Sequence, residues 1–513
     1  MVSLVVLNCK GVTMDFGKPT CEAIAVSGDK IFALGTNEDI SKLIGSSTKV
    51  IDANNASVLP GFIDSHVHLM QTGLNKAVAN LKEVKDNAEF FRVLLEHEKT
   101  LDNNEWLRGF GYNETLFIEK HLPSIEELDR IFPERPVFLT RTDSHSCFVN
   151  RKAFSLLNIP AETSGVEVDS RDNVTGILKG LANSTARKQI LDNHIEADTR
   201  KKALTRACID ALAEGVTTIH ALEGGEVFSE LDVETFLDVQ NSLPVRTVLY
   251  HQTMDIQKVL REGLPRIGGC IIVDGSLGSR TAALFEPYCD SPTTGSCYFE
   301  QRQIDEFVLE AHKNNLQIAM HTIGDRAIEM LLCAYEKALE EYPRKDHRHR
   351  FEHFSVPTYD QVVRAGKLGV SVSTQPVFDY YGGRENGLHL KILGPERKKR
   401  AYMQRTLIEA GILLSGSSDS DVSPISPLLG IYSVLLNSKP AERLSLFEAI
   451  KMFTINSAKL AFEEDKKGTV TVGKLADIVI LDRDIFTCQP EDLIKVKVDK
   501  TIIGGKVAYT RPL

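Results

Sequence analysis

Three features are scarce in these 513 residues, and each absence excludes a class of protein. The nine cysteines form no Cys-x-x-Cys pair, and an odd number without a disulfide framework indicates free thiols in a reducing cytoplasm. No window approaches the roughly 20 apolar residues of a membrane span, and residues 1–7 carry no charged leader, so we expect no signal peptide. The 60 basic residues are outnumbered by 70 acidic ones, which removes the electrostatic reason to expect a nucleic-acid partner.

Both ends of the chain have the pattern of short strands. Hydrophobic residues make up 42% and charged residues 25%, an ordinary globular composition, and the length suggests several domains or one large α/β barrel with additions. We expect residues 1–57 and 466–513 to build one small β-sandwich-like domain; two unrelated edge hairpins are the alternative. The apolar runs of strand length near the C-terminus are Gly468–Val472, Asp477–Leu481 and Lys500–Tyr509.

The middle of the chain, residues 58–465, alternates between helix and strand patterns. Ala203–Glu214 has the apolar spacing of a helix that ends at Gly215, and strand and helix patterns then recur through Ile412–Gly416. Repeated strand–helix units predict a parallel sheet with helices outside, as in a (β/α)8 TIM-type barrel. An open doubly wound sheet is the alternative, but its usual glycine fingerprint is missing. Residues 75–200 do not fit the repeat, and we predict an insertion there, near the barrel mouth.

The sharpest local motif is PGFIDSHVH at residues 60–68. Alternate residues of a strand point to the same side, so His66 and His68 can reach one point. Two neutral imidazoles that converge at a strand end are suited to binding zinc. A His-x-His pair alone is weak evidence, because histidines also cap strands or bond to the backbone.

Further candidate ligands fall where later predicted strands end. The carboxyl ends of all strands of a barrel meet at one face, where active sites lie. Four histidines and one aspartate would therefore converge, which predicts a site for one or two divalent metal ions, zinc before others. The residues that join His66 and His68 are His321, His353 and Asp419.

On these residues the chain resembles the amidohydrolase superfamily of metal-dependent hydrolases. The PGFIDSHVH motif is similar to the first-strand signature of that superfamily, and residues 473–479 resemble its return into the small sheet domain. The resemblance runs nearly end to end and is much less specific for a substrate than for the family. The segments that resemble the branch called amidohydrolase family 3, or YtcJ-like, are Arg135–Asn150, Asp274–Ala282 and His321–Ala327.

The resemblance implies a role for each candidate ligand. His66, His68 and Asp419 would hold the more buried metal, and His321 and His353 would hold a second one. Asp419 is similar to the base of the family, which takes a proton from a metal-activated water and can return it to the leaving nitrogen.

One position departs from the family pattern. Many relatives have a lysine four residues before the Asp-Gly-Ser run, whose carboxylated side chain bridges two metals, and here that position is Cys270. A thiolate binds zinc well and could bridge in its place. Equally, Cys270 could be a small buried hydrophobe beside a single metal. Either way, a carbamate-bridged pair at this position is excluded.

Three other residues are candidate substrate contacts. His145 matches a histidine that the branch often places at the pocket, His220 ends a predicted strand, and Arg280 lies in the loop after the Cys270 strand. For His220 and Arg280 the alternative is a supporting role. His347 and His349 lie in a basic loop, and we predict that both are at the surface.

These observations predict a cytoplasmic hydrolase that cleaves a non-peptide carbon–nitrogen bond, of the amide type, in a small molecule. The alternative within the superfamily is a mononuclear-metal deaminase, which the missing lysine keeps open. A rival of another class is a non-catalytic barrel that serves as a binding protein, although such proteins normally lose ligands, and here all remain. We expect no membrane and no nucleic-acid partner; a homodimer is the default for a soluble enzyme.

Overall fold

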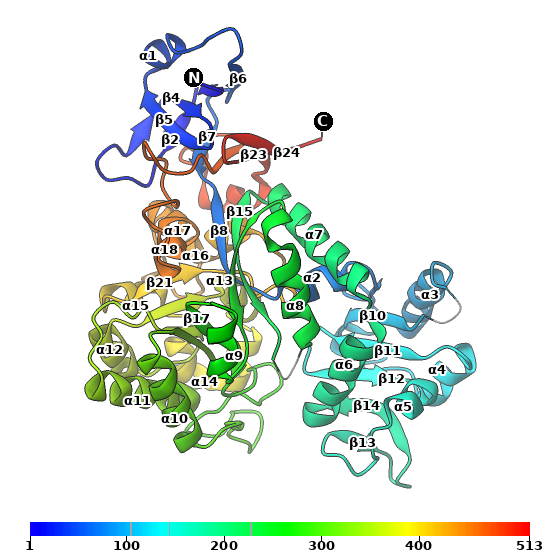
Figure 1. Ribbon diagram of the computed structural model, residues 1–513. Helices are drawn as coiled ribbons and strands as arrows, with labels where there is room; N and C mark the ends of the chain where they lie inside the picture. The colour runs from blue at the N-terminus through cyan, green and yellow to red at the C-terminus, as the bar shows by residue number, and fades with distance from the viewer. Residues whose placement is uncertain (103–104, 143, 226–227, 513) are drawn as a thin grey trace. The chain divides into compact units, whose positions relative to one another are not determined.

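The computed structural model describes residues 1–102, 105–142, 144–225 and 228–512 (Figure 1). These residues form two compact units. The first unit consists of Met1–His68, Cys208–Leu222 and Ser242–Leu513, and the second of Leu69–Ala207 and Glu223–Asn241. Among the described residues, no helix has both the length and the apolar character needed to cross a membrane.

Eight strands of the first unit form two sheets, one of three strands and one of five. β8 (Phe62–Val67) pairs in parallel with β15 (Val216–Glu223), and β16 (Arg246–His251) lies on the far side of β15. The second sheet is parallel throughout and has the order β17 (Arg266–Ile272), β18 (Gln317–Thr322), β19 (Arg350–His353), β20 (Ser371–Thr374) and β21 (Leu413–Gly416).

The two parallel sheets are joined where their strands end. Val67, the last residue of β8, forms a parallel bridge with Ser420, just beyond β21. Every residue of β8, β15 and β18 is buried, as expected for parallel strands that are covered on both faces. The carboxyl ends of strands from both sheets therefore lie together.

Amphipathic helices connect consecutive strands of the second sheet. α10 (Gln301–Lys313), α11 (Asp325–Glu341) and α12 (Tyr359–Leu368) lie side by side along one flank of the strands (Figure 1). Thr358 caps the start of α12, because its hydroxyl accepts a hydrogen bond from the Gln361 amide, and Gly369, with a φ of 71°, caps its end. The residues that α11 buries recur every three or four positions, as one helix face requires, and include Ile328, Leu331, Leu332, Tyr335 and Ala338.

The other α-helices described in the first unit lie outside this row of three helices. They are α1 (Asn37–Ser41), α9 (Ile256–Arg261), α13 (Pro376–Gly382), α14 (Leu388–Arg400), α15 (Gln404–Glu409), α16 (Pro427–Leu435), α17 (Leu446–Met452) and α18 (Ile455–Leu460).

Strands from both ends of the chain pair with one another in the first unit. β7 (Ser57–Pro60) pairs antiparallel with β22 (Ile478–Leu481), which places the first sixty residues beside the last forty. Gly468–Val472, predicted as a strand, forms none, because Gly468 has a φ of 86° and turns the chain. The six-stranded sheet runs β24 (Lys506–Thr510), β23 (Val498–Ile503), β22, β7, β2 (Lys10–Val12) and β3 (Thr20–Cys21), and a four-stranded sheet runs β5 (Lys30–Gly35), β4 (Ala23–Ser27), β1 (Leu4–Leu7) and β6 (Lys49–Asp52).

The second unit contains a sheet of its own. The sequence pattern predicts an insertion in this part of the chain but none of these strands. Aromatic and aliphatic side chains, among them Phe90, Phe117 and Phe148, form a core against this sheet. The sheet runs β13 (Val166–Val168), β14 (Val174–Lys179), β12 (Ser146–Val149), β11 (Val137–Arg141), β10 (Leu107–Tyr112) and β9 (Ala79–Asn80). The helices of this part of the chain are α2 (Leu69–Asn75), α3 (Asn87–Glu98), α4 (Ile125–Ile131), α5 (Arg151–Leu157), α6 (Gly180–His194), α7 (Ala197–Ala213, whose last residues belong to the first unit) and α8 (Glu230–Val239).

Candidate metal centre

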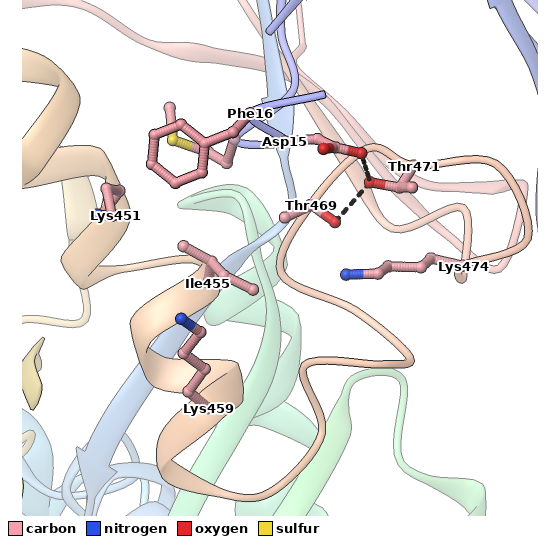
Figure 2. Close-up of a pocket in the computed structure, with 9 residues that line it drawn as sticks. Asp15, Phe16, Lys451, Ile455, Lys459, Thr469, Thr471 and Lys474 are labelled. Carbon is pink, nitrogen blue, oxygen red and sulfur yellow. Dashed lines mark hydrogen bonds between the residues drawn. The ribbon is translucent and has the colours of Figure 1, made fainter. Parts of the chain in front are cut away.

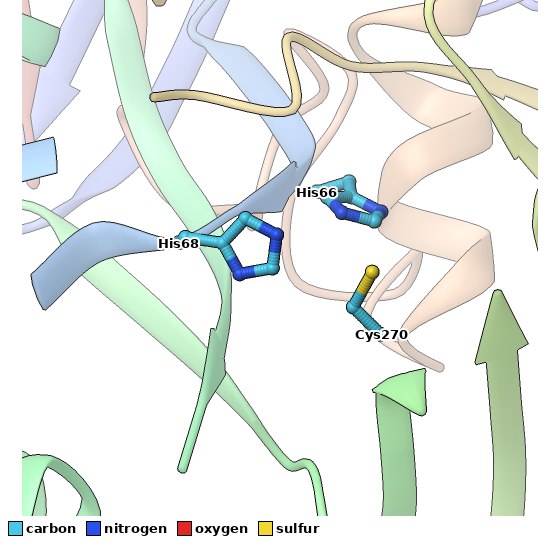
Figure 3. A group of neighbouring side chains, drawn as sticks. All are labelled: His66, His68 and Cys270. Atoms are coloured by element: carbon cyan, nitrogen blue, oxygen red, sulfur yellow. The ribbon is translucent and has the colours of Figure 1, made fainter. Parts of the chain in front are cut away.

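Six predicted residues come together at the carboxyl ends of the parallel strands. They form three overlapping groups, and within each group the potential ligand atoms lie within 4.8 Å of one another. Figure 3 shows the first group, in which both rings of the His-x-His motif lie beside the Cys270 sulfur. Cys270, His66 and His353 each belong to two of the groups, and Cys270 is the member shared by the His-x-His pair and the pair His321 and His353. The groups are His66–His68–Cys270, Cys270–His321–His353 and His66–His353–Asp419.

Two residues of this ligand cluster have an unusual backbone conformation. His353 has a φ of 70° and Asp419 has a φ of 57°. Both lie in the left-handed region, which residues other than glycine rarely adopt. Such strain persists only where the surroundings hold it, and it is concentrated at functional sites. At Asp419 the backbone amide donates to the His66 carbonyl at 2.9 Å, which ties the loop after β21 to β8.

Each histidine of the ligand cluster has one ring nitrogen near an acceptor outside the cluster. His66 Nδ1 lies 2.6 Å from a Glu352 carboxylate oxygen, and His353 Nδ1 lies 2.6 Å from the Gln375 side-chain oxygen. His68 Nδ1 faces the Leu222 carbonyl and His321 Nε2 faces the Gly275 carbonyl, both at 3.3 Å. The second nitrogen of each ring is thereby left for the centre of the cluster.

The nitrogens that face the centre fit a metal ion. His66 Nε2 and His68 Nε2 lie 3.1 Å and 3.3 Å from the same Asp419 oxygen, and Cys270 Sγ lies 3.5 Å from His321 Nδ1. The Nε2 atoms of His66 and His353 are buried and form no hydrogen bond. Buried polar atoms normally have a partner, so these two nitrogens fit a role as metal ligands. Imidazole, thiolate and carboxylate are the donors that zinc prefers.

Neighbouring histidines lower the pKa of two acidic side chains in the ligand cluster. Burial would raise the pKa of the Cys270 thiol, but the charge of the His321 ring and its hydrogen bond to the sulfur hold this pKa well below its usual value. Burial likewise opposes ionisation of Asp419, and His66 and His68 outweigh it, so the pKa of this carboxyl is also well below its usual value. These neighbours therefore favour the deprotonated forms of Cys270 and Asp419, which are the forms that bind metal.

A buried ion pair lies directly behind the His66 ring. Glu352, which approaches His66, also accepts hydrogen bonds from the Arg350 guanidinium, and both side chains are fully buried. Neither residue was predicted from the sequence to be functional. A signal was available, since two charged residues at alternate positions of a buried strand must face the same interior.

His220 lies behind these residues rather than among the ligands. It is fully buried in β15, with Nδ1 3.3 Å from the Arg350 guanidinium, and burial followed by the positive charge of Arg350 keeps its pKa well below the usual value. This placement favours the supporting role over the predicted substrate contact. Arg280 pairs with Asp290 at 2.6 Å and has a left-handed φ of 58°. His145 lies between β11 and β12 in the second unit, and its contact with substrate stays a prediction.

The prediction that His347 and His349 lie at the surface is wrong. Both are at most 1% exposed, because their ring nitrogens satisfy buried groups. His349 Nδ1 accepts a hydrogen bond from the Ile318 amide, and its Nε2 lies 2.8 Å from His312 Nδ1. His347 accepts from the His349 amide and donates to the Leu368 carbonyl. Neighbouring arginines in the sequence had suggested a solvated loop.

A separate cavity of about 230 Å³ contains none of the predicted site residues (Figure 2). Its polar lining includes Asp15, which accepts a hydrogen bond from Thr471, and the Lys474 amine, which donates to the Glu464 carbonyl. These groups are satisfied within the protein and present no cluster of metal ligands.

Comparisons with known proteins place the chain in a family. Residues 49–509 match the model of the amidohydrolase family. The putative amidohydrolase YtcJ of Bacillus subtilis is 30% identical, with 96% of each chain covered. The N-substituted formamide deformylase of Arthrobacter pascens is 25% identical over 100% of this chain and 99% of its own.

A solved structure agrees with these relatives. An uncharacterized metal-dependent hydrolase from Pyrococcus horikoshii superposes with a TM-score of 0.79 at 25% identity, covering 95% of this chain and 99% of its own. The resemblance predicted from the sequence is confirmed. The chain is thus a hydrolase and belongs to the amidohydrolase family.

Proposed function

We propose that this hydrolase uses a divalent metal centre to cleave a non-peptide carbon–nitrogen bond, of the amide type, in a small molecule. The observation that carries the proposal is the convergence of His66, His68, Cys270, His321, His353 and Asp419 in overlapping groups with their donor atoms turned inward. The similarity to an N-substituted formamide deformylase supports an amide-type bond.

The fold supports a single active-site face. We infer that the three-stranded and five-stranded parallel sheets are two arcs of one (β/α)8 barrel, with the Val67–Ser420 bridge at one seam. The ligand cluster then lies at the carboxyl face of the barrel, where such enzymes hold their sites. Pairing of β7 with β22 supports a small β domain from residues 1–57 and 466–513, with the barrel between them.

Two metal positions share Cys270 in this proposal, with zinc as the metal. His66, His68 and Asp419 would hold one ion and His321 and His353 the other, with the Cys270 thiolate between them. A bound divalent metal polarises the substrate carbonyl and lowers the pKa of water to about 7. The position of Cys270 in two ligand groups and its lowered thiol pKa favour a ligand over a small buried hydrophobe.

Asp419 is the proposed general base. Its Oδ1 lies 3.1 Å from His66 Nε2 and 3.3 Å from His68 Nε2, so the carboxylate faces the other ligands of the cluster. Its lowered pKa keeps it ionised before each turnover. It takes a proton from the attacking water and delivers that proton to the leaving nitrogen, so that an amide yields a carboxylate and an amine.

The second candidate is a mononuclear-metal deaminase. Cys270 stands where many relatives have the bridging lysine, and the loss of that lysine is compatible with a single metal ion. In addition, a putative adenine deaminase of Halalkalibacterium halodurans is 25% identical over 53% of this chain. The products separate the two. Amide hydrolysis yields one carboxylate per turnover, whereas deamination yields ammonia and no carboxylate.

The test is the Asp419→Asn variant, assayed against a panel of N-formyl and N-acyl amines and amino-substituted heterocycles. We expect loss of turnover with the metal still bound. Asp15→Asn, which changes a carboxylate in the cavity of Figure 2, is the control and should leave turnover unchanged. Turnover that survives in Asp419→Asn would show that another group is the base.

A further inference from the structure

The Glu352 carboxylate connects a ligand histidine to a buried arginine. Its Oε2 lies 2.6 Å from His66 Nδ1 and accepts a hydrogen bond from Arg350 Nη2 at 2.8 Å, while Arg350 Nε donates to its other oxygen. All three side chains are fully buried. The carboxylate is therefore held from one side by a fork of two N–H groups and is presented to His66 from the other.

Arg350 is itself fixed. Its Nη2 donates to the Ser65 carbonyl of β8 at 2.8 Å, and its guanidinium lies 4.4 Å from the centre of the Tyr250 ring. The guanidinium thus links β19 to the strand that carries His66. A bidentate arginine keeps a buried carboxylate ionised, and an ionised carboxylate can only accept, so the proton between Glu352 and His66 belongs to Nδ1.

The other ligand histidines have different outer partners. His68 and His321 face backbone carbonyls, and His353 faces the neutral Gln375 side chain. His321 Nε2 also lies 3.5 Å from Asp274, but the oxygens of that carboxylate already accept three backbone amides. The contact between His66 and Glu352, at 2.6 Å, is therefore much shorter than the one between His321 and Asp274.

We propose that Glu352, held by Arg350, is a positioning residue that fixes the proton of His66 on Nδ1 and aims Nε2 at the metal. A negative acceptor on Nδ1 also increases the basicity of Nε2, as carboxylate partners of metal-binding histidines do. The ion on the His66 side of the centre is consequently the one retained longer. This inference rests on the proposed function, because it assumes that the cluster binds a metal.

The test measures zinc retention rather than activity. Purified full-length protein is loaded with zinc and dialysed against a soluble chelator, and the zinc left per chain is followed over time. Glu352→Asp keeps the charge opposite Arg350 but shortens the reach to His66, so we expect zinc loss to be faster by about tenfold or more. Glu352→Gln keeps the reach without the charge and should lie between Glu352→Asp and the unaltered protein.

Two controls separate positioning from general damage. Glu448→Gln removes a carboxylate that pairs with Arg405 at 2.7 Å elsewhere in the same unit, and it should leave zinc retention unchanged. The melting temperature of metal-free Glu352→Asp should stay within a few degrees of that of the unaltered protein. Zinc loss at the unaltered rate in Glu352→Asp would overturn the proposal.

A second measurement does not depend on metal or on folding of the variants. Nitrogen NMR of histidine-labelled, metal-free protein, recorded at an alkaline pH at which the His66 ring is neutral, reports which nitrogen of His66 carries the proton. We expect protonated Nδ1, and a neutral ring protonated on Nε2 would overturn the proposal. A protein that binds no zinc but has His66 protonated on Nδ1 would refute the proposed function and leave the role of Glu352 on the His66 tautomer standing.

Discussion

Glu352 and His353 are neighbours in the chain, yet both side chains reach the ligand cluster. Glu352 Oε2 lies 2.6 Å from His66 Nδ1, and the His353 ring centre lies 5.1 Å from that of His66. A regular strand would point successive side chains to opposite faces. The left-handed backbone of His353, with a φ of 70°, ends the strand and turns the ring inward.

This conformation predicts an unusual order of stability for two variants. His353→Gly and His353→Ala remove the same ring, but glycine adopts a φ of 70° without steric cost, whereas alanine does not. We expect metal-free His353→Gly to be more stable than His353→Ala by about 1 kcal/mol, measured by urea denaturation. Greater stability of the alanine variant would contradict the strain at this position.

The buried Asp274 carboxylate predicts a second stability effect. Its oxygens accept hydrogen bonds from the backbone amides of Ala283, Ile323 and Gly324 at 2.8 to 2.9 Å. An asparagine at this position would turn an NH2 group toward one of these N–H donors. We expect Asp274→Asn to lower the free energy of unfolding by about 2–3 kcal/mol. A loss below about 0.5 kcal/mol would mean that the carboxylate does not organise this loop.

His349 predicts a dependence of stability on pH. Burial, followed by the positive charge that His347 can carry, keeps its pKa well below the usual value, so the unfolded chain binds a proton there that the folded chain does not. Stability contributed in this way is present above pH 6.5 and falls as the pH is lowered, by up to about 1.4 kcal/mol per pH unit for one group. Urea denaturation of metal-free protein between pH 7 and pH 5 measures the slope.

The matched variant for this prediction is His349→Gln, which cannot take up a proton. Its stability should decrease less steeply between pH 7 and pH 5 than that of the unaltered protein, whatever the difference in stability at pH 7. Equal slopes in the two proteins would show that His349 does not titrate on unfolding.

The ligand cluster could be predicted because its geometry follows from strand order. His66, His68, His321 and His353 lie on strands or directly after them, and parallel strands bring such positions to one edge. Cys270 was identified as a candidate by its place in the family pattern, but whether it faced the cluster depended on the local course of β17.

Other features depend on contacts that no local pattern contains. Arg350 and Glu352 pair with each other on β19, but their contacts with Ser65 and His66 of β8 bring together distant parts of the chain. Charged residues close together in a sequence normally indicate a solvated face. His347 and His349 were wrongly placed at the surface for the same reason. The sheet of the second unit was missed because its strands are short and separated by irregular segments, so their pairing is not evident from the sequence.

The most direct test of the metal centre is the metal content per chain, measured by mass spectrometry on protein purified without added metal, with Cys270→Ala beside it. Cys9→Ala, which removes a free cysteine that belongs to none of the ligand groups, is the control. The thiolate-bridged centre predicts about two zinc ions per chain, a lower content in Cys270→Ala and an unchanged content in Cys9→Ala. About one ion per chain, the same in all three proteins, would contradict the bridged centre and favour the mononuclear deaminase.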